Sequence, residues 1–130
     1  MSGDISVVGM DHIVLACADV EATLAWYLDV VGLAPVRVDE WRQGEASFPS
    51  ARVDAGTIID FIHGDPSSGR LDHLCLVIEP TDLSELAASS TLDVIEGPVT
   101  RYGARGNGTS LYVHDPDGTV VELRHYSSPG

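Results

Sequence analysis

Met10-Asp11-His12-Ile13-Val14-Leu15 recurs later in the chain as Leu71-Asp72-His73-Leu74-Cys75-Leu76, and each position is identical or apolar in both copies. A second matching pair follows in the same order and at almost the same spacing: Gly56-Thr57-Ile58-Ile59-Asp60-Phe61 and Gly118-Thr119-Val120-Val121-Glu122-Leu123. Two matches in one order indicate a structural module that the chain uses twice. We therefore expect module one over about residues 9–63 and module two over about residues 71–126.

Each module is expected to contain a strand, a helix and three further strands. The first helix should follow Asp19, which suits an N-cap, and end before Gly32; the second should begin at Thr81 or Asp82. The pattern predicts strands at residues 11–18, 34–41, 46–54 and 57–63, and then at residues 71–79, 92–95, 109–114 and 119–126. Asp115-Pro116-Asp117-Gly118 is a hairpin-turn signal. The repeated order βαβββ predicts the α+β class.

Size and charge limit the possible functions. The 130 residues suffice for one domain, and two half-length modules are each too small to be stable alone, so we expect a single domain over residues 1–130. The chain has 20 acidic residues against 7 basic ones, a net charge of −13. This balance argues against nucleic acids and membranes as partners. All seven basic residues are arginines, and the absence of lysine excludes Schiff-base enzymes and Walker P-loops.

The chain also lacks the signals of export. It contains no apolar run of about 20 residues, and its first residues lack the basic and apolar segments of a signal peptide. Cys17 and Cys75 do not have the spacing of a disulfide framework or a zinc knuckle. We expect a cytoplasmic protein.

The repeat places four ionisable residues at equivalent positions. Each module has a histidine on its first strand, His12 or His73, and a carboxylate on its last strand, Asp60 or Glu122. Strand alternation gives each of them apolar neighbours on its face, where a bare carboxylate is costly. Two histidines and one or two carboxylates suit a divalent metal ion such as Ni, Co, Mn, Fe or Zn. The alternative is that each is a structural residue with its own hydrogen-bond partner.

The two His-containing segments, the helix segment Ala22-Thr23-Leu24-Ala25-Trp26-Tyr27 and the turn followed by Glu122 together resemble the vicinal oxygen chelate superfamily. The resemblance covers about residues 10–126. It implies the glyoxalase-like fold, in which two βαβββ modules form a cupped mixed sheet around a metal site. It also implies that His12, His73 and Glu122 are metal ligands. Asp60 falls where glyoxalase I has a glutamate, so it is a fourth ligand candidate.

The resemblance further implies a metal-dependent enzyme of the glyoxalase I type, a lyase or isomerase. One divalent ion would chelate vicinal oxygens of a small substrate and stabilise an enediolate-like intermediate, with Asp60 or Glu122 as the catalytic base. Homodimers are common among these proteins, so we expect one here. Candidate residues of the substrate pocket are Ser110, Tyr112, Cys75, Phe48 and Arg124.

Other members of the superfamily remain open as alternatives. A metal-free protein that binds a small molecule or antibiotic, as bleomycin-resistance proteins do, would suit the acidic chain. An extradiol dioxygenase is a further alternative, although such enzymes commonly use longer chains. An epimerase is another, since Asp60 and Glu122 are both possible bases. Metal analysis distinguishes the binding protein from the enzymes. The glycine-rich segment at residues 103–108 is expected to be a mobile loop over the pocket.

Overall fold

The computed structural model of the chain describes residues 5–114, 116 and 118–126. Its contacts divide the chain into two compact units. The N-terminal unit is His12–Asp72, and the C-terminal unit combines Met1–Asp11 with His73–Gly130. Two strands, β1 (Val7–Cys17) and β5 (Leu71–Ile78), contribute residues to both units.

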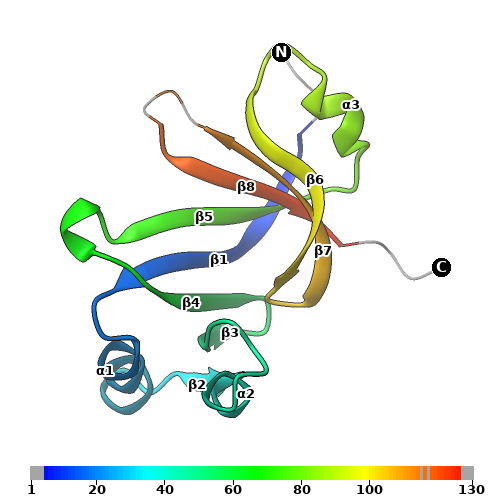
Figure 1. Cartoon of the computed structure of the whole chain (residues 1–130). Coiled ribbons are helices and arrows are strands. Elements are labelled where there is room, and N and C mark those ends of the chain that lie inside the picture. Colours follow the sequence, from blue (N-terminus) through cyan, green and yellow to red (C-terminus); the bar gives the residue numbers. More distant parts are fainter. Residues whose placement is uncertain (1–4, 115, 117, 127–130) are drawn as a thin grey trace. The chain divides into compact units, whose positions relative to one another are not determined.

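The N-terminal unit contains four strands in the order β2-β3-β4-β1 (Figure 1). β1 and β4 pair in parallel, whereas β3 pairs antiparallel with both β2 and β4. Besides β1, its elements are α1 (Val20–Ala25), a π-helix (Trp26–Val30), β2 (Ala34–Val36), α2 (Val38–Arg42), β3 (Ser50–Asp54), β4 (Thr57–His63) and a 3-10 helix (Pro66–Ser68).

The C-terminal unit contains four strands in the order β5-β8-β7-β6. Here β5 and β8 pair in parallel, and β7 pairs antiparallel with β8 and β6. Its elements are β5 (Leu71–Ile78), α3 (Leu83–Ala87), β6 (Asp93–Gly103), β7 (Gly106–His114) and β8 (Val120–His125). Each unit therefore has a parallel pair formed by its first and last strands, which is the arrangement of a βαβββ module.

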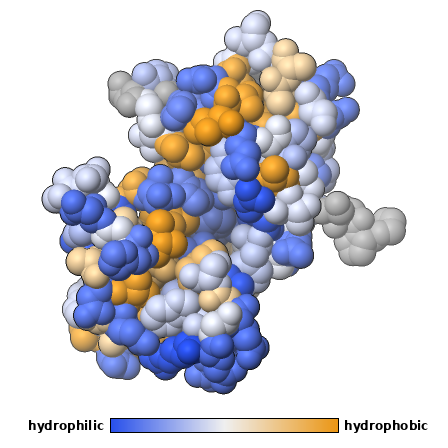
Figure 2. Space-filling model, viewed as in Figure 1, coloured by the Kyte–Doolittle hydropathy of each residue, from blue (hydrophilic) through white to orange (hydrophobic). Residues whose placement is uncertain are grey.

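Each unit has its own hydrophobic core. In the N-terminal unit, buried residues from β1, α1, α2, β3 and β4 pack together: Cys17, Leu24, Val38, Ala51 and Phe61. In the C-terminal unit, α3 packs on its strands through Ile78, Leu83, Leu86, Leu111, Val113 and Leu123. Figure 2 shows one face of the molecule, where hydrophilic residues predominate and apolar residues form separate patches. Among the residues that the structure describes, every helix is too short or too polar to span a lipid bilayer.

The predicted α+β class and repeated module are confirmed, and the helix starts are confirmed in detail. Asp19 accepts a hydrogen bond from the Ala22 amide at 3.1 Å, and Asp82 caps α3 through the amides of Ser84 and Glu85. Gly32 follows the first helix with a φ of 88°, the left-handed conformation that favours glycine.

Several local predictions are wrong, among them the strand expected at residues 46–54, which begins only at Ser50, and the strand expected at residues 92–95, which extends to Gly103. The strand expected at residues 34–41 ends at Val36, because Arg37 adopts a left-handed conformation and starts α2. The segment at residues 103–108 is not a loop but a tight hairpin, in which β6 ends at Gly103 and β7 begins at Gly106. The turn predicted at residues 115–118 includes Asp115 and Asp117, which lie outside the described residues.

Candidate functional site

The N-terminal unit contains a buried pair formed by His12 on β1 and Asp60 on β4. Both residues are 2% exposed, and His12 Nε2 lies 3.8 Å from Asp60 Oδ2. The other carboxylate oxygen, Oδ1, accepts a hydrogen bond of 2.5 Å from the Ser50 hydroxyl on β3. Asp60 is aligned with Val14 in the parallel pairing, so it shares a face with His12, two residues before Val14.

The C-terminal unit contains an equivalent pair formed by His73 on β5 and Glu122 on β8. His73 Nε2 lies 3.0 Å from Glu122 Oε1, and Glu122 is 1% exposed. Its other oxygen, Oε2, accepts hydrogen bonds from the Ser110 hydroxyl at 2.6 Å and from Arg124 Nη1 at 3.1 Å. Glu122 is aligned with Cys75, again the second residue after the histidine. The repeat in the sequence therefore corresponds to the same placement of an imidazole and a carboxylate in each unit.

The two serines reach their carboxylates from different register positions. Ser50 lies directly opposite Asp60 in the β3–β4 pairing. The residue opposite Glu122 is Tyr112, whereas Ser110 lies opposite Arg124, two residues farther along. Glutamate is one methylene longer than aspartate, so Glu122 can extend to a hydroxyl that is not directly opposite it.

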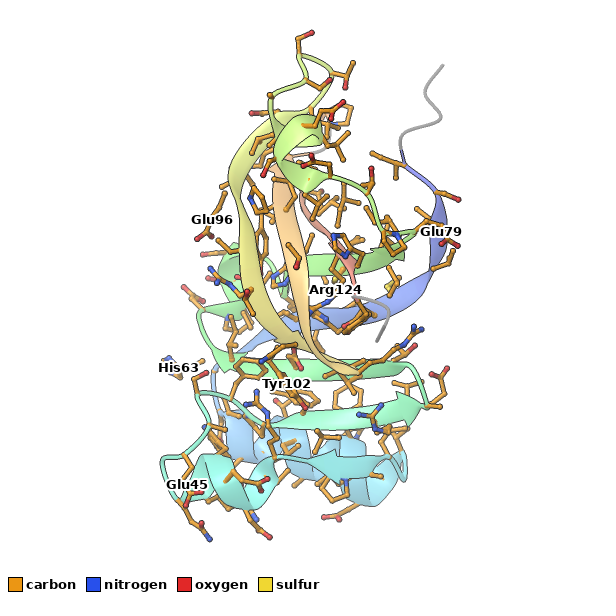
Figure 3. The ribbon with its side chains drawn as sticks, turned by 90° about the vertical axis from the view of Figure 1, so that its right-hand side faces the viewer. Glu45, His63, Glu79, Glu96, Tyr102 and Arg124 are labelled. Atoms are coloured by element: carbon orange, nitrogen blue, oxygen red, sulfur yellow. The ribbon has the colours of Figure 1, made fainter. Side chains whose placement is uncertain are left out.

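Arg124 is 0% exposed and lies in the interior of the C-terminal unit (Figure 3). Besides Glu122, its guanidinium donates to the carbonyl oxygens of Tyr102, at 3.3 Å, and of Arg101. Its Nε lies 4.0 Å from Asp11 Oδ2. Burial by itself lowers the pKa of Arg124, but its acidic neighbours outweigh this effect and raise the pKa above its ordinary value; they are Tyr126, Cys75, Glu122 and Asp11. The buried guanidinium therefore stays charged.

Asp11 is also 0% exposed and is held from two further sides. The Ala104 amide donates to its Oδ1 at 2.9 Å, and the Tyr126 hydroxyl donates to its Oδ2. Burial and this hydrogen bond raise the pKa of Tyr126 above its ordinary value, so the phenol keeps its proton. The Arg124 guanidinium lies 4.9 Å from the centre of the Tyr126 ring. Asp11, Tyr126 and Arg124 thus form one buried network behind Glu122.

Tyr112 borders the pair on the same face of β7 as Ser110. Its ring lies edge-on to the His73 ring, with centroids 5.6 Å apart, and the Arg101 guanidinium lies 5.9 Å from its centre. Burial, followed by the charge of Glu122, raises the pKa of Tyr112 above its ordinary value. Tyr112 can therefore donate a hydrogen bond at neutral pH but does not serve as a base there.

The remaining two pocket candidates are Cys75, which is aligned with Glu122 in the β5–β8 pairing, and Phe48. Cys75 is 0% exposed, and burial, with the charges of Glu122 and Asp11, raises the pKa of its thiol above the ordinary value. It is consequently a neutral packing residue at physiological pH rather than a nucleophile. Phe48 belongs to the N-terminal unit, where the Arg37 guanidinium lies 4.9 Å from the centre of its ring.

The donor atoms of the C-terminal pair suit a divalent cation. When two ligand atoms bind one ion at about 2.1 Å each and the angle between the two bonds is about 90°, the ligand atoms lie about 3.0 Å apart. His73 Nε2 and Glu122 Oε1 have this separation, and the donors on Oε2 leave Oε1 directed at the histidine. His12 Nε2 and Asp60 Oδ2, at 3.8 Å, are farther apart than that spacing requires. Imidazole nitrogen with carboxylate oxygen is a donor set that suits first-row transition metals.

Three residues around the pairs were not proposed from the sequence as site residues. Tyr126 follows Glu122 and Arg124 at two-residue intervals, and strand alternation was a signal that could have identified it. Asp11 precedes His12 in the repeated motif, and Asp72 holds the same position before His73. Asp11 is buried and Asp72 is exposed, a difference that the repeat alone does not reveal. Ser50 has no sequence signal, because its contact with Asp60 depends on the β3–β4 register.

Comparison with known proteins adds the following similarities. The family model described as Glyoxalase/Bleomycin resistance protein/Dioxygenase superfamily matches residues 9–123. A glyoxalase domain-containing protein of Mycosarcoma maydis is 32% identical over 127 residues, which cover 94% of this chain and 70% of that protein. A virulence protein of Salmonella typhimurium is 29% identical over 122 residues, covering 90% and 83% of the two chains.

A solved structure shows the same fold. The methylmalonyl-CoA epimerase from Mycobacterium tuberculosis superposes with a TM-score of 0.66 at 20% sequence identity, covering 98% of this chain and 94% of the epimerase. At this identity the similarity extends to the fold alone.

Proposed function

The chain belongs to the Glyoxalase/Bleomycin resistance protein/Dioxygenase superfamily, and on this premise we propose that it is a metal-dependent enzyme of the glyoxalase type. In this proposal His12, His73 and Glu122 hold one divalent ion, and the reaction is that of a lyase or isomerase on a small substrate. The observation that carries the proposal is the 3.0 Å separation between His73 Nε2 and Glu122 Oε1.

Two further features support the assignment. Glu122 is held on Oε2 by a serine and an arginine, and such fixed orientation by outer partners is typical of metal ligands. His12 occupies the position in its unit that His73 occupies in the other, with a carboxylate aligned to the residue two positions later in both cases.

The chemistry divides between the ion and the protein. A divalent ion bound there would act as a Lewis acid toward two neighbouring oxygens of the substrate. Tyr112, protonated and beside His73, can donate a hydrogen bond to a substrate oxygen. Asp60 is the proposed general base, because its wider spacing from His12 suits it less well as a ligand than Glu122. The proposal includes a small-molecule substrate and a homodimer.

Metal content tests the proposal. Purified without chelators, the protein is expected to contain, or to take up from Ni, Co, Mn, Fe or Zn, about one ion per chain. His73→Gln should lose this ion, whereas His63→Gln, at an exposed histidine at the end of β4, should retain it. Elemental analysis after dialysis measures both. Absence of uptake in the unmodified protein would instead favour a metal-free binding protein.

Asp60→Asn separates a base from a ligand. The amide of this variant keeps an oxygen for the Ser50 hydroxyl but cannot accept a proton, so turnover should fall by about 100-fold or more. Metal content should stay within about twofold, since other residues hold the ion in the proposal. Turnover is measured on the substrate found by screening hemithioacetals, diols, catechols and acyl-CoA compounds.

The exposed Asp29, in the π-helix, provides the control as Asp29→Asn, which should leave turnover unchanged. Unchanged turnover in Asp60→Asn would rule out its role as the base. Loss of the ion in that variant would show that Asp60 is a ligand instead.

A further inference from the structure

Arg124 touches Glu122 although it is not a member of the proposed ligand set. Its Nη1 donates to Glu122 Oε2, and its Nη2 donates to the Arg101 carbonyl oxygen. The guanidinium is thereby bound to the backbone of β6 as well as to Glu122. Because the group is planar and is held at two of its nitrogens, its orientation is fixed. The carboxylate that it binds is consequently held in one orientation as well.

Two glycines provide the space for this guanidinium. A Cβ atom at Gly103 would lie 2.6 Å from Arg124 Cζ and 2.7 Å from Asp11 Oδ1. A Cβ atom at Gly108 would lie 2.8 Å from Arg124 Nη2 and 2.9 Å from the His125 carbonyl oxygen. These distances are below van der Waals contact, so any larger residue would displace Arg124. The hairpin of β6 and β7 is therefore shaped around this side chain.

Asp11 provides the counter-charge on the far side of the guanidinium. Asp11, Glu122 and Arg124 are the buried charged residues among the described part of the C-terminal unit. The Tyr126 hydroxyl and the Ala104 amide hold the Asp11 carboxylate in place. Arg124 therefore lies between two fixed carboxylates, of which Glu122 pairs with His73.

We infer that Arg124 is a positioning residue, which binds Glu122 Oε2 so that Oε1 is directed at His73 Nε2. Ser110 holds the same oxygen but, as a single hydroxyl, leaves the carboxylate free to rotate about its own hydrogen bond. The consequence for metal affinity rests on the proposed function, whereas the orientation of Glu122 does not. A lysine keeps the charge but lacks the planar fork that contacts Glu122 and the β6 carbonyl oxygens together.

Arg124→Lys tests the inference, with Arg42→Lys as the matched control. Arg42 is on α2 of the N-terminal unit, its side chain is 51% exposed, and it pairs with Glu21 at 2.8 Å. The first readout is the 15N NMR signal of the His73 ring in the metal-free protein. Arg124→Lys should shift this signal, since the contact with Glu122 changes, while the exposed His63 signal stays in place. Arg42→Lys should shift neither.

The second readout is metal affinity by titration calorimetry. Arg124→Lys should bind the ion about 10- to 100-fold more weakly, and Arg42→Lys should stay within about twofold of the unmodified protein. If the unmodified protein binds no metal, the proposed function fails, and the His73 signal still decides the inference. An unchanged His73 signal in folded Arg124→Lys would overturn it.

A second variant covers the case in which Arg124→Lys does not fold. Gly108→Ala keeps Arg124 but pushes its guanidinium away, and it should shift the His73 signal in the same direction. Gly9→Ala is the matched control, because a Cβ atom there meets nothing within 4 Å. Identical His73 signals in Gly108→Ala and Gly9→Ala would also overturn the inference.

Discussion

Glu122→Gln is expected to abolish metal binding and turnover while leaving the protein folded. The change replaces one carboxylate oxygen by an amide NH2 group and keeps the length of the side chain. Two donors, the Ser110 hydroxyl and Arg124 Nη1, both require an acceptor at the Oε2 position. The amide oxygen should therefore occupy that position, which directs the NH2 group at His73.

The effect should be large because an amide NH2 group has no lone pair for a cation. The variant would thus present a donor where the proposed site needs a ligand oxygen. We expect metal affinity to fall by more than about 100-fold. Loss of a residue that only hydrogen-bonds to a ligand typically lowers metal affinity by about 10- to 100-fold, and loss of a ligand should lower it further. Calorimetric titration measures the affinity, and urea unfolding of the metal-free protein checks that the fold is retained.

Glu96→Gln is the matched control for this substitution. Glu96 is on the edge strand β6, its side chain is 53% exposed, and it pairs with Arg101 at 3.0 Å. An exposed ion pair of this kind contributes at most about 1 kcal/mol, so metal affinity and turnover should not change. Full metal binding by Glu122→Gln would show that Glu122 is not a ligand.

Phe61→Ala is expected to cost about 3–5 kcal/mol of unfolding free energy, the largest stability effect that we expect. Phe61 is 0% exposed, follows Asp60 on β4, and packs on Tyr27 with ring centroids 5.3 Å apart. Its side chain belongs to the N-terminal core together with Leu24 and Cys17. Truncation would leave a cavity in the layer that supports the strand of Asp60.

Urea unfolding followed by circular dichroism measures the loss, and Val53→Ala on β3 is the control. Val53 is 48% exposed, so removing its methyl groups should change stability by less than about 0.5 kcal/mol. A loss of about 3–5 kcal/mol is a large fraction of a typical total of about 5–15 kcal/mol, so it would be evident as a lower urea midpoint. Equal midpoints for the two variants would show that the Phe61 core is not well packed.

The repeat in the sequence was sufficient to predict the module and its ionisable residues. His12 and His73 are on the strands expected for them, and Asp60 and Glu122 are on the last strand of each unit. This was possible because strand position depends on local alternation and turn residues, which adjacent residues encode. The cap at Asp19 was predictable for the same reason, since its partner is only three residues away.

The differences between the two copies were not predictable from the repeat. Asp11 and Asp72 occupy equivalent positions in the sequence, yet Asp11 is buried and bound by Tyr126, whereas Asp72 is exposed. The partner of Asp11 comes from the far end of the chain. No local pattern contains that information.

The sequence by itself determined the α+β class, the repeated module and the strands that carry its two equivalent histidines and two equivalent carboxylates. The tertiary structure alone decided how each carboxylate is held: Ser50 from the opposite register position, but Ser110 and Arg124 from a shifted one. It also decided that Gly103 and Gly108 make room for a buried guanidinium rather than form a loop. The physical reason is that strand formation depends on neighbours in sequence, whereas the orientation of a buried carboxylate depends on donors from other strands, whose register only the folded sheet defines.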